Sequence, residues 1–237
     1  PVRVGASIGD IIAGLFTTIG VLMALHHRGI SGEGQKIDVS MLDCQVAVLE
    51  NAIARYLVTG VVPGPLGTRH PSITPFDAFK SKDGYVILGA GNDRLWEKLC
   101  DIIGQPELKA DPRFKTNALR TQNFRELYGY LDTAFQDRTT ADWIAALEAA
   151  GIPCGPINTV DKVVADPQIL FREMIVATNH PVAGAVKMAG VPIKMSATPG
   201  GIDAAAPLLG QHTAEILREM LGMTEDEVER LRQREVV

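Results

Sequence analysis

The first residues whose types and spacing could do chemistry are Gly9 and Asp10, directly before an apolar stretch from Ile11 to Leu25. The stretch predicts a helix, and we expect Asp10 at its N-cap. An aspartate there accepts backbone N–H bonds, and the helix dipole favours its charged form. A carboxylate held at the mouth of a buried helix is a candidate nucleophile. An ordinary capping aspartate would give the same pattern, so the case depends on the rest of the chain.

A rival motif overlaps these residues. The run from Gly5 to Gly9 reads G-x-S-x-G, the nucleophile elbow of α/β-hydrolases, with Ser7 as nucleophile and His212 as base. That elbow follows strands built from upstream sequence, and only four residues precede Gly5, so we reject this interpretation. His26 and His27 do not indicate a metal site, because adjacent residues on a helix do not face each other. No metal site is predicted.

Composition narrows the class of protein. With 46% hydrophobic residues and a net charge of -5, the chain reads as globular, and its acidic balance argues against a nucleic-acid partner. Three dispersed cysteines without a C-x-x-C pair predict a cytoplasmic location. The apolar stretch falls short of the roughly 20 residues that span a bilayer, so we expect a helix buried in protein and no membrane partner. Such a helix needs walls, and we expect the chain to be the C-terminal part of a longer protein.

The chain reads as mixed α/β, with a small unit between two parts of a larger one. Prolines and glycines crowd residues 60–75, which predicts a linker. The Asp83-Gly84 pair between apolar runs predicts a hairpin, and Asn92 is placed to cap the helix that follows. We therefore expect part of a large domain at 1–62, a linker and small α+β domain at 63–172, and a return segment at 173–237.

Local patterns predict the individual elements. Apolar spacing and capping signals, including a Thr224-x-x-Glu227 capping box, predict helices at 11–25, 41–58, 92–103, 122–136, 140–150, 159–165, 211–221 and 225–234. Alternating or β-rich runs predict strands at 36–40, 76–80, 85–88, 175–177, 185–186 and 191–193. Trp96 and Trp143 fall at core spacing of their helices.

Several motifs in this order resemble the family III CoA-transferases of the CaiB/BaiF type. They are Gly9-Asp10, the turn and strand from Ser31 to Met41, Lys82-Asp-Gly-Tyr85, Gly91-Asn-Asp93, Gly151-Ile-Pro-Cys-Gly-Pro-Ile157 and Pro207-Leu-Leu-Gly-Gln-His-Thr213. The resemblance runs nearly end to end and covers the C-terminal portion of the family's usual length. It implies part of a Rossmann-like large domain with an inserted small α+β domain, in an interlocked homodimer.

The resemblance also implies the chemistry. Asp10 matches the family's catalytic aspartate, which attacks an acyl-CoA thioester and forms first a mixed anhydride and then an aspartyl-CoA thioester before an acid acceptor takes the CoA. Met41 matches a position that lines the CoA site. No permanently bound cofactor is expected, because coenzyme A and acyl-CoA are substrates alongside a small carboxylic acid. Similarity to the dicarboxylate-using branch favours succinyl-CoA as donor.

Two alternatives remain open. The related α-methylacyl-CoA racemases use an acidic residue just after the second hairpin strand, where this chain has Asn92, and an amide cannot exchange a proton. Asp93 follows directly and would restore a carboxylate there. A catalytically incomplete fragment or assembly subunit is the second alternative. The short stretch from Gly67 to Ile73 also replaces the long glycine-rich loop of formyl-type members, which disfavours oxalate or formyl specificity.

Overall fold

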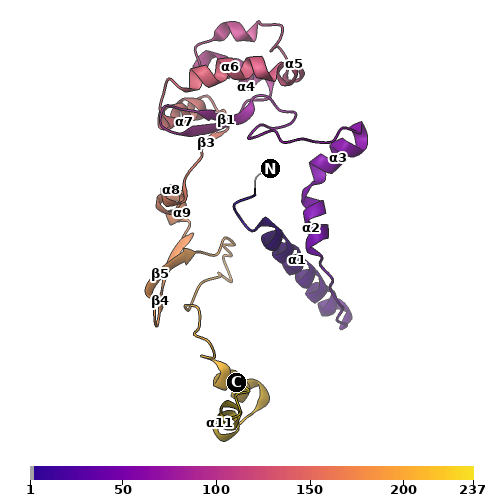
Figure 1. Ribbon diagram of the computed structural model, residues 1–237, viewed down its shortest axis with the longest axis vertical. Coiled ribbons are helices and arrows are strands. Elements are labelled where there is room, and N and C mark those ends of the chain that lie inside the picture. Colours follow the sequence, from indigo (N-terminus) through magenta and orange to yellow (C-terminus); the bar gives the residue numbers. More distant parts are fainter. Residues whose placement is uncertain (1–2) are drawn as a thin grey trace. The chain divides into compact units, whose positions relative to one another are not determined.

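The structure is a computed structural model that describes residues 3–237 (Figure 1). The chain divides into two compact units, one extending to Gly155 and the other covering Pro156–Val237. The mixed α/β character expected from the sequence is confirmed. The division into segments 1–62, 63–172 and 173–237 stays a prediction.

The first unit opens with a long helix and a chain that returns along it. Helix α1 spans Ile8–Ser31 and ends at Gly32, whose φ of 76° is the left-handed conformation that glycine adopts without a Cβ clash. Residues 33–40 then lead into α2 (Met41–Val48) without forming a helix or strand. A Cβ on Gly20 would lie 3.1 Å from Cγ2 of Ile37, so the missing side chain allows this close approach.

Two expectations for this region are wrong. The predicted strand at 36–40 forms neither helix nor strand and pairs with no strand among the described residues, and a strand needs a partner for its backbone groups. The predicted helix 41–58 divides at Leu49 into α2 and α3 (Glu50–Thr59). The N–H of Leu49 is shared between the carbonyls of Gln45 and Val46, a tightened turn that ends α2.

A small sheet carries the core of the first unit. Strands β1 (Phe76–Lys80) and β2 (Tyr85–Gly89) pair antiparallel with Phe76 opposite Gly89, which confirms the hairpin. A third strand not expected from the sequence, β3 (Cys154–Pro156), joins β2 to give the order β1-β2-β3. Proline-flanked and only three residues long, it carries no alternating pattern by which a strand is recognised.

Helices surround this sheet, as Figure 1 shows at the top of the view. They are α4 (Asp93–Ile102), the short 3-10 helix η1 (Pro106–Lys109), α5 (Asn117–Gln122), α6 (Phe124–Phe135) and α7 (Thr140–Ala149). The helix predicted at 122–136 is thus α6, preceded by a separate α5. Trp96 and Trp143 are both buried in the common core, as expected.

The second unit holds a hairpin between two pairs of helices in sequence. It contains α8 (Val160–Ala165), α9 (Pro167–Phe171), β4 (Ile175–His180), β5 (Gly184–Ala189), α10 (Thr213–Leu221) and α11 (Glu225–Gln233). Both bonds of the Thr224–Glu227 capping box are formed, which confirms that motif. The strand predicted at 191–193 is wrong: Pro192 has no N–H to donate, and the segment pairs with nothing described.

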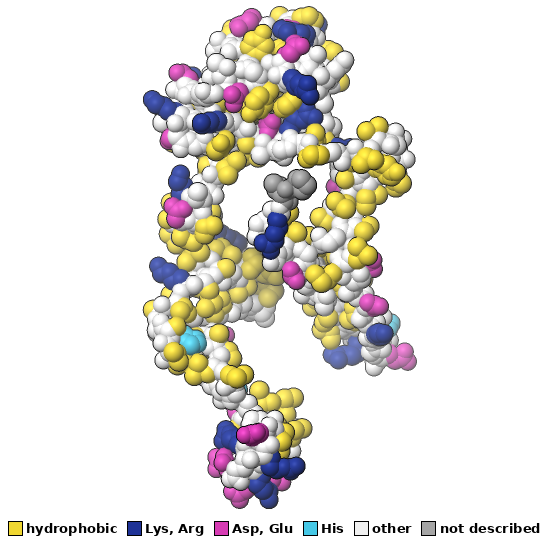
Figure 2. All heavy atoms as spheres, viewed as in Figure 1, with side chains coloured by type: hydrophobic (Ala, Val, Ile, Leu, Met, Phe, Trp, Pro, Cys, Tyr) yellow, Lys and Arg dark blue, Asp and Glu magenta, His cyan; other side chains and the backbone are white. Residues whose placement is uncertain are grey.

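Helix α1 differs most from expectation. It has 24 residues where about 15 were expected, and none of its residues is buried. Leu15 and Leu22 are each 60% exposed, and apolar side chains gather over the α1, α2 and α3 segments in Figure 2. By length and composition alone, α1 could cross a membrane. The expectation that the apolar stretch is too short to span a bilayer is therefore wrong.

Candidate functional site

Asp10 lies in the first turn of α1, where its carboxylate meets the positive end of the helix dipole. The N-cap position belongs to Ser7, so the expectation that Asp10 itself caps the helix is wrong. The helix begins three residues earlier than the apolar pattern indicates, because Ile8 and Gly9 already adopt helical conformation. Asp10 is exposed, not shielded by a buried helix, and no ion pair within residues 3–237 involves it.

Met41, the other residue assigned to the site, lies against the same helical turn. Its Cε is 3.7 Å from the position that a Cβ on Gly9 would occupy, and the amide of Gln45 follows at 3.8 Å. Met41 and Gln45 are four residues apart on α2, so both present to the same face. The structure thus brings Met41 together with the Gly9–Asp10 step. The return of the chain through residues 33–40 makes this possible by placing the start of α2 beside the start of α1.

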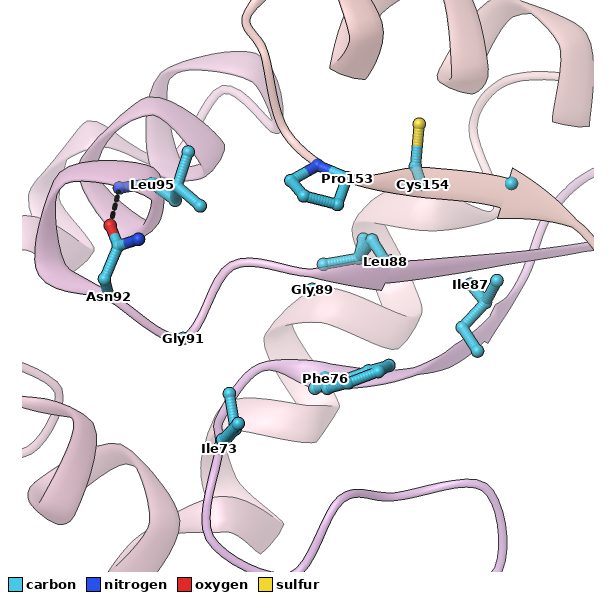
Figure 3. Close-up of a pocket in the computed structure, with 11 residues that line it drawn as sticks. Ile73, Phe76, Ile87, Leu88, Gly89, Gly91, Asn92, Leu95, Pro153 and Cys154 are labelled. Carbon is cyan, nitrogen blue, oxygen red and sulfur yellow. Dashed lines mark hydrogen bonds between the residues drawn. The ribbon is translucent and has the colours of Figure 1, made fainter. Parts of the chain in front are cut away.

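A separate apolar cavity of about 600 Å³ opens at the end of β2 (Figure 3). Its walls come from the linker, the hairpin, the start of α4 and the approach to β3, and they are Ile73, Phe76, Ile87, Leu88, Gly89, Gly91, Asn92, Leu95, Pro153, Cys154 and Gly155. The Asn92 side chain is its most polar group. Pockets of this size and lining suit a small organic ligand.

The side chains of Asn92 and Asp93 both make structural contacts, a helix cap and an ion pair. The Asn92 Oδ1 accepts the N–H of Leu95 at 2.9 Å and caps α4, as the sequence predicts. The Asp93 carboxylate pairs at 3.0 Å with the guanidinium of Arg120, whose side chain is fully buried. A carboxylate tied into an ion pair with a buried arginine is not free to approach a substrate, so Asp93 is a poor candidate for proton exchange. This arrangement disfavours the racemase alternative at both positions.

Arg120 also fixes the backbone around the cavity. It donates to the carbonyls of Thr74 at 2.8 Å, Phe114 at 3.0 Å and Gly91 at 2.7 Å. Burial lowers the pKa of Arg120, and the hydrogen bond to Asp93 opposes that effect. Sequence reasoning missed this residue, because its partners lie up to 46 residues away and leave no local pattern.

The histidines carry local structure. His70 Nδ1 accepts the N–H groups of Ser72 and Ile73 at 3.2 and 3.1 Å, and its ring stacks on Phe76. His212 Nδ1 lies 3.0 Å from Glu215 at the start of α10. Within residues 3–237 no group of three or more metal-ligating side chains occurs. Ser7 makes no side-chain capping bond.

The cysteines are free thiols. Burial raises the pKa of Cys100 to about 12 and raises the pKa of Cys154 as well, so neither is activated as a thiolate.

Comparison with known proteins supports one family throughout. The model of CoA-transferase family III matches residues 1–213, which include all of α1. A succinyl-CoA:glutarate CoA-transferase of Mus musculus is 38% identical over 98% of this chain and 53% of its own length. A succinyl-CoA–D-citramalate CoA-transferase of Chloroflexus aurantiacus is 36% identical over 100% of this chain and 59% of its own.

The fold agrees with the sequence comparison. The crystal structure of a CAIB/BAIF family protein from Brucella suis matches with a TM-score of 0.78 and 36% identity, over 92% of this chain and 57% of that one. This chain spans a little over half the length of these matched proteins. The matches therefore cover only part of each of these proteins, and the chain belongs to CoA-transferase family III.

Proposed function

We propose that the protein transfers coenzyme A from a dicarboxylic acyl-CoA, with succinyl-CoA as the expected donor, to a dicarboxylic acid acceptor, and that Asp10 is the nucleophile. The observation that carries the proposal is the position of Asp10. It lies in the first turn of a helix, exposed and without an ion-pair partner among the described residues, one residue from the glycine that Met41 contacts. Two relatives, each named for succinyl-CoA, support the choice of donor.

The reaction requires only exchanges of acyl bonds. An Asp10 carboxylate oxygen attacks the thioester carbonyl, and the carbon–sulfur bond breaks. CoA departs as its thiolate, and Asp10 now carries the acyl group as a mixed anhydride. The thiolate then attacks the aspartyl carbonyl and releases the donor acid as its carboxylate. The acceptor carboxylate displaces CoA from the resulting aspartyl thioester, and the thiolate captures the acceptor acyl group and regenerates Asp10. Covalent catalysis of this kind divides one difficult transfer into easier steps.

The setting of Asp10 suits these steps. The first step begins, and the last step ends, with a free carboxylate on the first turn of α1, where the helix dipole stabilises negative charge. Met41 is proposed to line the CoA site beside it. No permanently bound cofactor is required, since the CoA thioester supplies both the activated acyl group and the thiolate.

We also propose an interlocked homodimer in the cytoplasm, as the family resemblance implies. The exposed apolar side chains of α1 support a covering partner, because an amphipathic or apolar helix gains stability only by burying that surface. The family model includes α1 as part of the transferase domain, which favours protein over lipid as its cover.

A transfer assay tests the function directly. The intact protein, given succinyl-CoA, should form new acyl-CoA with glutarate and far less with a monocarboxylic acid of equal length, as followed by chromatography of the CoA esters. Asp10→Asn should abolish transfer, whereas the neighbouring Thr17→Ala on α1 should retain it. Exchange of the α-proton of a branched acyl-CoA without transfer would instead support the racemase alternative.

A further inference from the structure

The side-chain amide nitrogen of Gln45 is buried and has no hydrogen-bond partner among the described residues. Buried amide groups are nearly always paired, since an unpaired one loses its bonds to water without compensation. An exception of this kind calls for an explanation at the place where it occurs.

That place is the first turn of α1. The Nε2 of Gln45 lies 3.8 Å, and its Cδ 4.0 Å, from the position of a Cβ on Gly9. Because Gly9 has no side chain, the amide sits directly against the helix backbone, one residue before Asp10. The nearest residue of α1 with a side-chain acceptor on that turn is Asp10, whose carboxylate has no ion-pair partner among residues 3–237.

We propose that Gln45 is the positioning residue of the Asp10 nucleophile: rotation of its side-chain amide, which is unpaired in this structure, lets it donate to the Asp10 carboxylate and hold it beside Met41. The inference rests on the proposed function only for its catalytic consequence. A carboxylate on a helix surface samples several rotamers, and one fixed donor restricts them to those that direct an oxygen at the thioester. Glutamine serves this role where lysine or arginine would not, because a neutral donor orients the carboxylate without forming a full ion pair that would weaken its attack.

The amide has one competing use. Turned over, its oxygen would accept from the N–H groups of the first turn of α1, where Ser7 provides no side-chain cap. Gln45 would then stabilise α1 and have no specific connection to Asp10. The experiment must therefore read the contact between the two side chains, not only the stability of the helix.

Nuclear magnetic resonance of the intact protein, labelled with 15N in its glutamine side chains, reads that contact. The Gln45→Leu variant identifies the pair of Gln45 amide resonances by their loss. We expect this pair to shift in Asp10→Ala and to stay in place in Asp43→Ala, a matched loss of a carboxylate on the helix that carries Gln45. If the Gln45 amide resonances keep their chemical shifts in Asp10→Ala, the proposal is overturned, whatever the activity of the protein.

Kinetics supply the second readout. Gln45→Leu, which keeps the apolar contact with Gly9, should slow acylation of Asp10 by about 100-fold while the KM for acyl-CoA changes less than about twofold. Gln45→Glu should not restore the rate, since an ionised carboxylate only accepts hydrogen bonds. Val46→Ala, one residue along α2, should acylate at the rate of the unaltered protein. Acylation by Gln45→Leu at that same rate would contradict the positioning role.

The two proposals fail in different ways. Coupled resonances without any acylation of Asp10 would reject the transferase function and keep the contact between Gln45 and Asp10. Acylation of Asp10 with uncoupled resonances would keep the function and reject the role of Gln45.

Discussion

At the scale of single residues, Arg120 is the side chain on which the geometry of the cavity most depends. It is fully buried and bonds three backbone carbonyls as well as Asp93. Its guanidinium also lies over the ring of Trp96, 5.3 Å from the centroid. Replacing it would leave the buried carbonyls of Thr74 and Phe114, and the carbonyl of Gly91 in the cavity wall, without their donor.

We therefore predict that Arg120→Leu lowers the free energy of unfolding by about 3–5 kcal/mol, the range found when one partner of a buried polar network is removed. Asp93→Asn should cost less than about 1 kcal/mol, because that side chain is 60% exposed and the variant removes no donor. Urea unfolding followed by circular dichroism measures both. Equal losses in the two variants would show that the carbonyl bonds contribute little.

The sequence predicts a candidate nucleophile but not the side chains around it. Asp10 and Met41 were assigned from the family resemblance, and the structure places them on adjoining turns of α1 and α2. Arg120 and Gln45 were missed, because each is defined by partners distant in sequence. A polar residue within a helical pattern reads as solvent-facing until the chain that covers it is known.

At the scale of elements, the junction of β2 with α4 is held by a close contact between Gly91 and Ile73. A Cβ on Gly91 would overlap Cγ2 of Ile73. Ile73 cannot easily retreat, because Asn117 bonds the backbone on both sides of it, at Ser72 and Thr74. The junction therefore needs glycine for space, and not for an unusual φ angle.

Gly91→Ala should cost about 1–3 kcal/mol of stability, as overpacking does in a filled site. The loss should shrink in an Ile73→Ala background, since that change removes the overlapping atom. A double-mutant cycle of chemical unfolding measures the coupling. Additive losses in the two backgrounds would contradict the contact.

The turn of the β1–β2 hairpin is tied to α7 through Asp83. The backbone N–H and the hydroxyl of Thr140 donate to its carboxylate at 2.8 and 2.9 Å. These bonds, and a weaker one from Ser81, hold the pKa of Asp83 below its ordinary value of 3.8. A depressed carboxyl pKa stabilises the fold above that ordinary value, and the contribution is lost as pH falls through the folded pKa.

We predict that Asp83→Ala is less stable than the unaltered protein at pH 7 and that the difference shrinks below about pH 4. Asp111→Ala is the matched control for the effect of low pH on a carboxyl group whose pKa is lowered. The pKa of Asp111 is lowered by Arg113 and not by Thr140. Urea midpoints between pH 7 and pH 3 give the profile. A difference that stays constant to pH 3 would reject the assignment.

Elements specified by neighbouring residues were predicted well. The Asp83-Gly84 hairpin, the Asn92 cap and the Thr224–Glu227 capping box each depend on contacts within a few residues. The strands expected at 36–40 and 191–193 failed because pairing depends on a second strand elsewhere in the chain. For the same reason β3 was missed, although it completes the sheet beside the cavity.

At the scale of the whole molecule, the main feature is the exposed apolar surface of α1. Helix α1 has 24 residues, is largely apolar and has no buried residue. Globular proteins rarely leave so large an apolar surface exposed to water. The family match covers this helix, and the matched relatives are nearly twice as long as the chain. The homodimer proposed above would cover α1 with a second copy and would also shield Asp10 from water.

The most direct test of the central claim is the mass of the protein during turnover. Incubated with succinyl-CoA and quenched with hydroxylamine or borohydride, the intact protein should carry a modification on the peptide that contains Asp10, and Asp10→Ala should carry none. That result would establish a covalent aspartyl intermediate. Turnover of CoA esters with Asp10 never modified, or modification that persists in Asp10→Ala, would contradict the account.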